Sequence, residues 1–431
     1  MHRERVSETA YKWWLALWIS GLFMPRMPLP FMPGKSALSL AVPVGLLYVL
    51  WRLTRHDLGV PAPVRFPILI AHLIAAYFLL HAVYCGLFAG RATMLMELQW
   101  VFFFVVSFFL VYDMRGLNDF KGRVTRSLVT LLFCEAVIAI PTAVLGPVYP
   151  QFVGAHGLRW FASYRAVGTL SSANSLAGLM AFGAVLALYA PRKELPANRA
   201  LLAAVLIAAL LLSQSKSGYG SIYAAVLVCT LLALAKLIAL PERFSPRKML
   251  SLVTACLILV ALGVAVLNVN AVFLLEEDLA IRLQLTRGVQ YSFETADLLT
   301  KSFGVGFRQT AQFNTTTGAW LTAHNSYIAL LAEIGIIGLV LLSAILLAEL
   351  AFFYKAGAMH WFAGVVIVIV HSTSECFLYA FLYVMLVGAM LPTAWLYYNE
   401  SLREAERRTV PIGYQASPRP PTSITAADGE Q

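Results

Sequence analysis

Long apolar runs recur along the whole chain of 431 residues, and they limit what it can fold into. Several approach the roughly 20 residues that a helix needs to cross a bilayer. Because the hydrocarbon core offers no water to backbone N–H and C=O groups, such segments have to be helical. Only 13% of the residues are charged, whereas soluble domains are about one quarter charged. The sequence therefore predicts an all-α polytopic membrane protein.

About twelve spans are expected from these runs. The first is short and is interrupted by Met24-Pro25, so an interfacial helix is an alternative there. We expect one transmembrane domain over residues 1–408, with one large loop at about 271–324. The segment 409–431 is rich in Pro, Ser and Thr, which predicts a disordered tail. The expected spans lie near 12–24, 36–53, 66–85, 93–112, 124–145, 172–190, 198–213, 217–240, 249–270, 325–352, 358–372 and 374–398.

The distribution of Lys and Arg predicts the orientation of these spans. Cytoplasmic loops of membrane proteins carry an excess of basic residues. With both termini in the cytoplasm, roughly two thirds of the 32 basic residues fall in inside segments. The net charge of +10 is then mainly a topology signal and an attraction to anionic lipid. It does not indicate binding to nucleic acid.

The cysteines predict neither a metal site nor a disulfide framework. Each sits singly inside an apolar run, and their spacing matches no ligand or disulfide pattern. We therefore interpret them as small apolar packing residues and expect no metal. They are Cys85, Cys134, Cys229, Cys256 and Cys376.

The main polar interruption, at about residues 271–324, faces outward in this topology. It carries Arg282, Arg287, Lys301 and Arg308, and it ends at His324. Because the positive-inside bias disfavours cations on this side, a cluster of them needs a compensating function. We therefore expect the loop to act on an anionic, lipid-borne substrate at the membrane surface.

Further cations face outward in two other segments. Arg159 and Arg165 lie within AHGLRWFASYRAVGTLSSANSLAG, and Lys216 lies within LLSQSKSGYGSIY. Arginine binds phosphate oxygens with two N–H groups, whereas lysine acts as a point charge. Several converging cations suit a diphosphate, whose charge has to be stabilised as it leaves.

Each of these residues also has a purely structural interpretation. Arg159 and Arg308 would be solvated loop charges, and Lys216 at a span boundary would be an interfacial anchor. Arg282 or Arg287 would pair with one of the nearby carboxylates at positions 276–278. His324 would be a hydrogen-bonding histidine, and Gly304 and Gly306 would be turn residues. Arg165 would simply precede a run of helix-capping residues.

A resemblance to a known family favours the functional interpretation. The stretch FGVGF, followed about twenty residues later by AHNSYIALLAEIGIIGL, resembles the signature of the O-antigen ligase and polysaccharide polymerase superfamily. RAVGTLSSANSLAG resembles the Arg, Gly and Asn pattern of that family, and SQSKSG occupies the place of its Ser-Arg-Gly element. The matching positions are Gly304, Gly306, His324, Asn325, Glu333, Gly335, Gly338, Arg165, Gly168 and Asn174.

The resemblance implies a membrane transferase domain over 1–408 that works on the periplasmic face of the bacterial inner membrane. Family members transfer a glycan from undecaprenyl diphosphate without a metal, nucleotide sugar or other cofactor. Ligases use lipid A-core as the acceptor, and polymerases use a second lipid-linked glycan. We expect the ligase type, with polymerase as the alternative. The chain departs from ligases at Lys216, where they usually have arginine, which leaves the two types open.

The resemblance also implies roles for individual residues. His324 would be the catalytic base or orienting group. Arg287 would bind the diphosphate, because Arg287 and Tyr291 fit the family's arginine-then-aromatic spacing, with Arg282 a close second for that position. Arg165 and Lys216 would bind diphosphate as well. The structural positions of the loop would be Gly304, Gly306 and Asn325.

A polytopic transporter or flippase is the more distant alternative. Transporters place ionisable groups near the bilayer midplane and are built from two related halves. This chain has few such residues, and its polarity is concentrated in one outward loop of the second half. The sequence therefore favours the transferase. The intramembrane candidates are Glu97, Glu135, Glu375 and His371.

Overall fold

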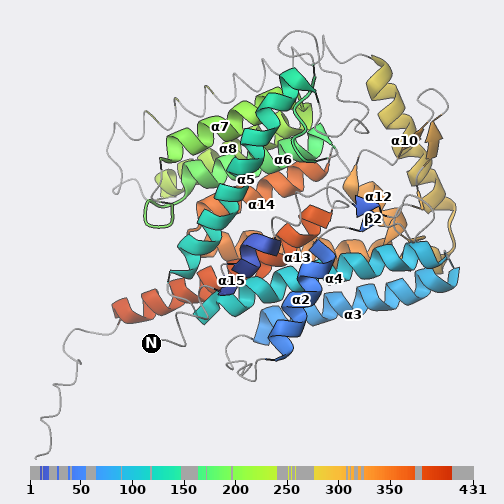
Figure 1. Ribbon diagram of the computed structural model, residues 1–431, viewed down its shortest axis with the longest axis horizontal. Helices are drawn as coiled ribbons and strands as arrows, with labels where there is room; N and C mark the ends of the chain where they lie inside the picture. Colours follow the sequence, from blue (N-terminus) through green and yellow to red (C-terminus); the bar gives the residue numbers. More distant parts are fainter. Residues whose placement is uncertain are drawn as a thin grey trace, which may run out of the picture.

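The computed structural model is a bundle of long helices with short accessory elements (Figure 1). Strands within the described part of the chain are confined to two antiparallel hairpins, in which Met27 lies opposite Leu38 and Phe313 lies opposite Trp320. The structure describes residues 10–11, 13–18, 27–28, 37–38, 41–54, 65–88, 90–116, 119–146, 164–170, 172–195, 198–239, 251, 254, 258, 276–306, 309–310, 312–314, 319–321, 325–373 and 381–409.

Ten predominantly apolar helices among the described residues build the bundle, and the polar helix α10 and several short elements lie between them in the chain. The ten helices are α2 (Ala41–Leu53), α3 (Arg65–Phe88), α4 (Arg91–Asp113), α5 (Phe120–Leu145), α6 (Ala173–Tyr189), α7 (Arg199–Leu212), α8 (Lys216–Ala239), α13 (Gly335–Lys355), α14 (Met359–Ser372) and α15 (Phe381–Thr409). The others are α10 (Glu276–Thr295), α11 (Leu298–Phe303), α12 (Ser326–Glu333), the 3-10 helix η2 (Met114–Gly116) and the strands β1 (Met27–Pro28), β2 (Ala37–Leu38), β3 (Gln312–Asn314) and β4 (Ala319–Leu321).

The predicted all-helical membrane architecture is confirmed. Helices α2 to α8 and α14 coincide with eight predicted spans to within a few residues. Four segments of the described chain are long and apolar enough to cross a membrane: Ile68–Phe88, Phe120–Leu145, Lys216–Lys236 and Gly335–Lys355. The total of twelve stays a prediction. The predicted spans near 12–24 and 249–270 and the predicted tail lie largely outside the described residues.

Two predicted spans differ from the structure. The single span expected at 325–352 is divided into α12 and α13, because Ile334 leaves helical geometry and Gly335 takes a φ of +68°. The last span was expected to end at 398, but α15 continues to Thr409. Its final turns carry exposed charged residues, which extend the helix beyond the apolar segment.

The helices form two groups that meet along α13. In the first group α4 packs between α3 and α15, and in the second α6 packs against α5, α7, α8 and α14. Helix α13 contacts both α14 and α15 and so joins the groups. Fully buried aromatic rings fill the interior, among them Phe104 and Phe108 of α4 and Trp361 of α14. In Figure 1, α10 lies at the right of the view, where α3 ends and α4 begins.

One end of the bundle holds a set of ion pairs between helix ends. Arg52 Nε lies 2.8 Å from Asp113 Oδ2, which joins the last turns of α2 and α4. Lys121 Nζ lies 2.9 Å from Glu400 Oε2, which joins the start of α5 to α15. We call this the ion-pair end. It collects basic residues that the sequence assigned to the inside: Arg52, Arg115, Lys121, Arg126, Arg199, Lys236 and Lys355.

Glu194, between α6 and α7, belongs to the same end. Its carboxylate accepts a hydrogen bond from Tyr397 OH at 2.5 Å and lies 3.0 Å from His360 Nε2. Burial alone would raise the pKa of Glu194, but these partners and Lys121 outweigh it and hold that pKa below its ordinary value. The carboxylate is therefore retained in its charged form and ties α14 and α15 to the α6–α7 connection.

Candidate functional site

Three helix ends meet around Arg165 at the end of the bundle opposite the ion pairs. Its Nε donates to the carbonyl of Ser213, which ends α7, at 2.8 Å. Its Nη2 donates to Oδ1 of Asn174, in the first turn of α6, at 2.6 Å. The neighbouring Ala166 N–H donates to Leu212 O at 2.9 Å. The guanidinium therefore locks the end of α7 to the start of α6.

Helix α8 begins at the same junction. Ser215 caps it, because its hydroxyl accepts from Gly218 N at 3.3 Å and its carbonyl accepts from Tyr219 N. Gln214 takes a left-handed φ of 51°, which turns the chain sharply from α7 into α8. Lys216 is the first residue of α8, and its side chain is exposed. The structure thus brings Lys216 and Arg165 to one junction.

Glu135 supports the segment that carries Arg165. This carboxylate, buried on α5, accepts from Thr169 N at 2.7 Å and from Thr169 Oγ1 at 2.9 Å. Gly168 has a φ of +59°, and a Cβ there would overlap Glu135 Oε1. The sequence left the role of Glu135 undecided, because a lone acid in an apolar run does not reveal its partner. Its geometry is that of a positioning residue.

Helix α14 links this junction to the start of α12. His371 Nε2 lies 3.0 Å from Asn174 O, and Tyr327 OH donates to Ile369 O at 3.0 Å. Asn325 caps α12, since its Oδ1 accepts from Tyr327 N at 3.0 Å and from Ile328 N at 3.2 Å. Asn325 therefore lies on the side of the bundle that holds Arg165. His324, the residue before it, lies outside the described residues.

The turn after α11 is held on the break between α12 and α13. Val305 N donates to Ala332 O at 3.0 Å, and Gly306 N donates to Glu333 O at 2.9 Å. Gly304 (φ +80°) packs so closely that a Cβ would overlap Glu333 O. The buried Glu333 carboxylate also accepts a hydrogen bond from the hydroxyl of Thr310. Gly304, Gly306 and Asn325 thus belong to one rigid unit built on α12.

Helix α10 lies over α12. Val289 and Phe293 pack against Ala329 and Ala332, and Leu285 is buried one turn before Val289. Arg287 lies two residues from Val289, off this buried stripe, and its side chain is exposed. The α10 backbone is helical at position 282, seven residues before Val289, but the side chain of Arg282 is outside the described part.

Asp297 is the N-cap of α11, in the connection that follows α10. Asp297 is exposed, and its carboxylate accepts from Thr300 N at 2.7 Å. This backbone hydrogen bond lowers the pKa of Asp297 below its ordinary value. Asp297 therefore caps α11 as an anion and sets the direction from which Phe303 and Gly304 approach α12.

The expected site residues fall into three groups, and we call the end of the bundle that holds them the loop end. Arg165 and Lys216 share the junction of α6, α7 and α8, while Gly304, Gly306 and Asn325 share the α11–α12 unit. Arg287 is on the exposed side of α10. The hydrogen bonds of α14 connect the first two groups. Outside the described residues lie Arg159, Arg308, His324 and Glu375.

Comparison with protein-family models finds a match that lies mostly in the second half of the chain. A family model described as O-antigen ligase matches residues 201–343, from α7 through the break into α13. The matched stretch contains the start of α8, α10, the Gly304 turn and α12. Among curated proteins, none matches the chain. Over this stretch, which is about a third of the chain, the protein is similar to the O-antigen ligase family, and the match supports the resemblance to the superfamily of O-antigen ligases and polymerases.

Proposed function

We propose that the protein is an inner-membrane glycosyltransferase of the O-antigen ligase type. It moves a glycan from undecaprenyl diphosphate to lipid A-core on the periplasmic face. The observation that carries this proposal is the junction at Arg165. There the N-terminal ends of α6 and α8, which favour anions, flank a guanidinium, and Lys216 is the first residue of α8. Such a junction suits a diphosphate at a membrane surface.

The orientation follows from the two ends of the bundle. The ion-pair end gathers basic residues from α2, α5, α8 and α13, so the positive-inside rule assigns it to the cytoplasm. The loop end then faces the periplasm. Undecaprenyl diphosphate-linked glycans and lipid A-core would both reach the site from the outer leaflet.

The chemistry is a displacement at the anomeric carbon. His324 accepts the proton of an acceptor hydroxyl, whose oxygen forms the new bond to the anomeric carbon. The bond from that carbon to the diphosphate oxygen breaks, and the diphosphate leaves with the bonding electron pair. Arg165, Lys216 and Arg287 stabilise its charge as it departs. A single displacement inverts the anomeric centre.

A polymerase is the second candidate, and Lys216 favours it. Ligases of the family usually have arginine at this position, and lysine keeps the charge but loses the two-pronged geometry. A polymerase would use the same diphosphate junction with a second lipid-linked glycan as acceptor. The acceptor alone distinguishes the two reactions.

The deciding experiment is transfer by the purified protein, supplied with undecaprenyl diphosphate-linked glycan and lipid A-core. We expect glycosylated lipid A-core from the wild type. In His324→Ala the rate falls by about 100-fold or more, because a general base contributes at least that factor. Product is resolved by mass and by release of free undecaprenyl diphosphate.

Other products have distinct meanings. Longer glycan chains still attached to the carrier identify a polymerase. Absence of transfer to either acceptor, in well-folded protein that moves the carrier across proteoliposomes, identifies a flippase and overturns the transferase. Equal rates for the wild type and His324→Ala remove His324 from the mechanism.

The same assay decides between the two α10 arginines. Position 282 is in helical register with Val289, which packs against α12, and with Leu285, which is buried, whereas Arg287 is exposed. We expect Arg287→Ala to raise the KM for the carrier by about tenfold, through loss of one charge-assisted phosphate contact. Lys301→Ala, on α11, is the matched control for removing a cation from the loop region. If only Arg282→Ala raises the KM, the diphosphate lies on the α12 side of α10.

A further inference from the structure

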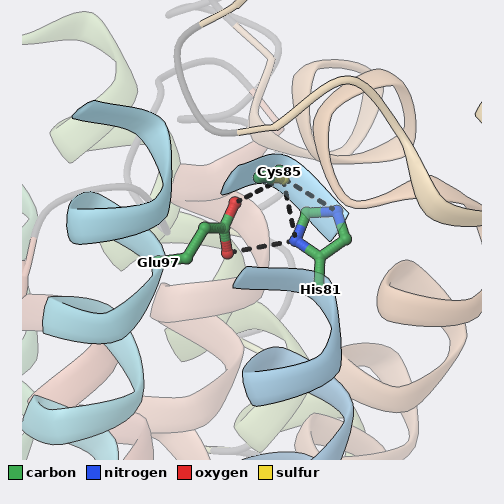
Figure 2. A group of neighbouring side chains, drawn as sticks. All are labelled: His81, Cys85 and Glu97. Atoms are coloured by element: carbon green, nitrogen blue, oxygen red, sulfur yellow. Dashed lines mark hydrogen bonds and ion pairs between the residues drawn. The ribbon is translucent and has the colours of Figure 1, made fainter. Parts of the chain in front are cut away.

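Three buried side chains with metal-ligating atoms meet where α3 and α4 approach α11. Figure 2 shows His81 and Cys85 on successive turns of α3 and Glu97 reaching them from α4. His81 Nδ1 lies 3.1 Å from Glu97 Oε2, and Cys85 Sγ lies 3.7 Å from His81 Nδ1 and 3.9 Å from Glu97 Oε1. All three side chains are fully buried. Each can offer one ligand atom to a common point.

The hydrogen bond on the far side of His81 fixes its tautomer. His81 Nε2 lies 2.5 Å from the carbonyl oxygen of Phe303, which only accepts, so Nε2 carries the proton. In the neutral ring Nδ1 is then the atom with the lone pair, and it lies 3.1 Å from Glu97 Oε2 and 3.7 Å from Cys85 Sγ. Metal-binding histidines commonly have this outer contact, in which the second ring N–H is held by a carbonyl or carboxylate.

The distances between the ligand atoms of His81, Cys85 and Glu97 suit an ion with tetrahedral coordination. With Zn–N and Zn–O distances near 2.0–2.2 Å and Zn–S near 2.3 Å, neighbouring ligand atoms lie about 3.3–3.6 Å apart. The observed separations are 3.1, 3.7 and 3.9 Å. Cys85 Sγ is also 3.8 Å from Nε2, so the imidazole has to turn slightly about its Cβ–Cγ bond to direct Nδ1 at a shared ion. The three residues supply three of the four positions of a tetrahedral site.

Charge balance favours occupation by a divalent ion. A thiolate at Cys85 and a carboxylate at Glu97 together carry the charge that one Zn²⁺ neutralises, and the His81 ring stays neutral. Burying an unpaired charge in an apolar site has a large desolvation free energy, so a set of ligands and ion with no net charge is favoured there. The ligand set of nitrogen, sulfur and oxygen is of the kind that Zn²⁺ accepts.

We infer that His81, Cys85 and Glu97 form a structural binding site for a Zn²⁺-type divalent ion. The site joins α3 to α4 and, through His81 and Phe303 O, holds the residue before Gly304. Tyr77, one turn earlier on α3, donates to Ile334 O at 2.5 Å and fastens the same break. The ion would therefore fix the helix pair on which the α11–α12 unit rests. It has no part in bond making, so the inference does not depend on the acceptor or on the transfer reaction.

Metal analysis of the purified full-length protein tests the inference, using an affinity tag free of histidine. After brief chelator washing we expect about one zinc ion per protein chain. Replacing zinc by Co²⁺ should give a thiolate-to-cobalt absorption band in the near ultraviolet. Cys85→Ser should remove the band and weaken binding by more than the 10- to 100-fold that changes outside the ligand shell cause. Cys134→Ser, on the exposed side of α5, is the matched control. It should keep both the absorption band and the affinity for the ion.

Glu97→Gln provides a second variant if Cys85→Ser fails to yield folded protein, as judged by size-exclusion chromatography. It retains the size and polarity of the side chain and should still lose the ion. The inference is overturned if folded wild type takes up neither Zn²⁺ nor Co²⁺. It is equally overturned if the metal content of Cys85→Ser or Glu97→Gln equals that of the wild type. In either case the three residues form a hydrogen-bonded group only.

Discussion

Replacing Arg165 by alanine should reduce kcat/KM for transfer by about 10³-fold, the upper end of the 10²–10³ that one lost electrostatic donor typically costs. Two effects combine. The proposed diphosphate site loses a guanidinium, and the partly buried Ser213 carbonyl and the Asn174 side-chain oxygen lose their donor. An unsatisfied buried acceptor costs about 1–3 kcal/mol, enough to loosen the junction between the end of α7 and the start of α6. The rate is measured with purified protein in the two-substrate assay, alongside the melting temperature.

Two further variants separate charge from geometry. Arg165→Lys keeps the charge but cannot span Ser213 and Asn174 in the same way, so we expect activity between those of the wild type and Arg165→Ala. Arg199→Ala removes an arginine at the ion-pair end, where Nη1 donates to Ala190 O at 2.5 Å, and should leave transfer unchanged. Equal activity of Arg165→Ala and Arg199→Ala would refute a role for Arg165 in the site.

Gly335→Ala should be among the most destabilising single substitutions in the described chain. Gly335 has a φ of +68°, and a Cβ there would overlap the backbone carbonyl of Ser302. The left-handed conformation alone costs an alanine about 1–2 kcal/mol. The overlap adds displacement of α11, so we expect a total loss of more than about 3 kcal/mol or failure to accumulate folded protein. Thermal unfolding in detergent measures it.

The chain supplies its own control for this change. Gly357 has nearly the same φ, +67°, with open space where a Cβ would stand. Gly357→Ala therefore reports the conformational cost alone and should lower stability by about 1–2 kcal/mol. If Gly335→Ala and Gly357→Ala melt alike, the close approach of α11 to the helix break contributes nothing to stability.

The positions of the helices could be predicted because hydrophobic periodicity and length depend on local sequence. The break at Ile334 could not, since the run from Ile328 to Ala348 is apolar throughout apart from Glu333 and Ser343. What divides it is the contact between Gly335 and Ser302, more than thirty residues away in the sequence. The α15 helix was likewise predicted too short, because hydropathy marks where lipid contact ends and not where helical hydrogen bonding ends.

The candidate site was predictable to a different degree at each position. Arg165 and Lys216 were selected as outward-facing cations, and both lie at one junction. The hydrogen bond from Arg165 to the Ser213 carbonyl at the end of α7 could not be predicted, because a backbone acceptor has no sequence signature. The group around Cys85 was missed because the histidine is only four residues away but the carboxylate comes from another helix. A search for ligands in pairs within one helix would have found His81 and Cys85.

The way the loop is fastened has a consequence for how such a protein can diversify. The Gly304 turn is attached through the main-chain groups of residues 305, 306, 332 and 333, and the helix break through Tyr77 and Ile334 O. Apart from the Tyr77 hydroxyl and the glycines at 304 and 335, this attachment uses main-chain groups. For the proposed transferase, the exposed side chains of α10 can therefore change to suit a different sugar without loss of the attachment. Substitutions that change the glycan preference and substitutions that unfold the protein would then affect different atoms.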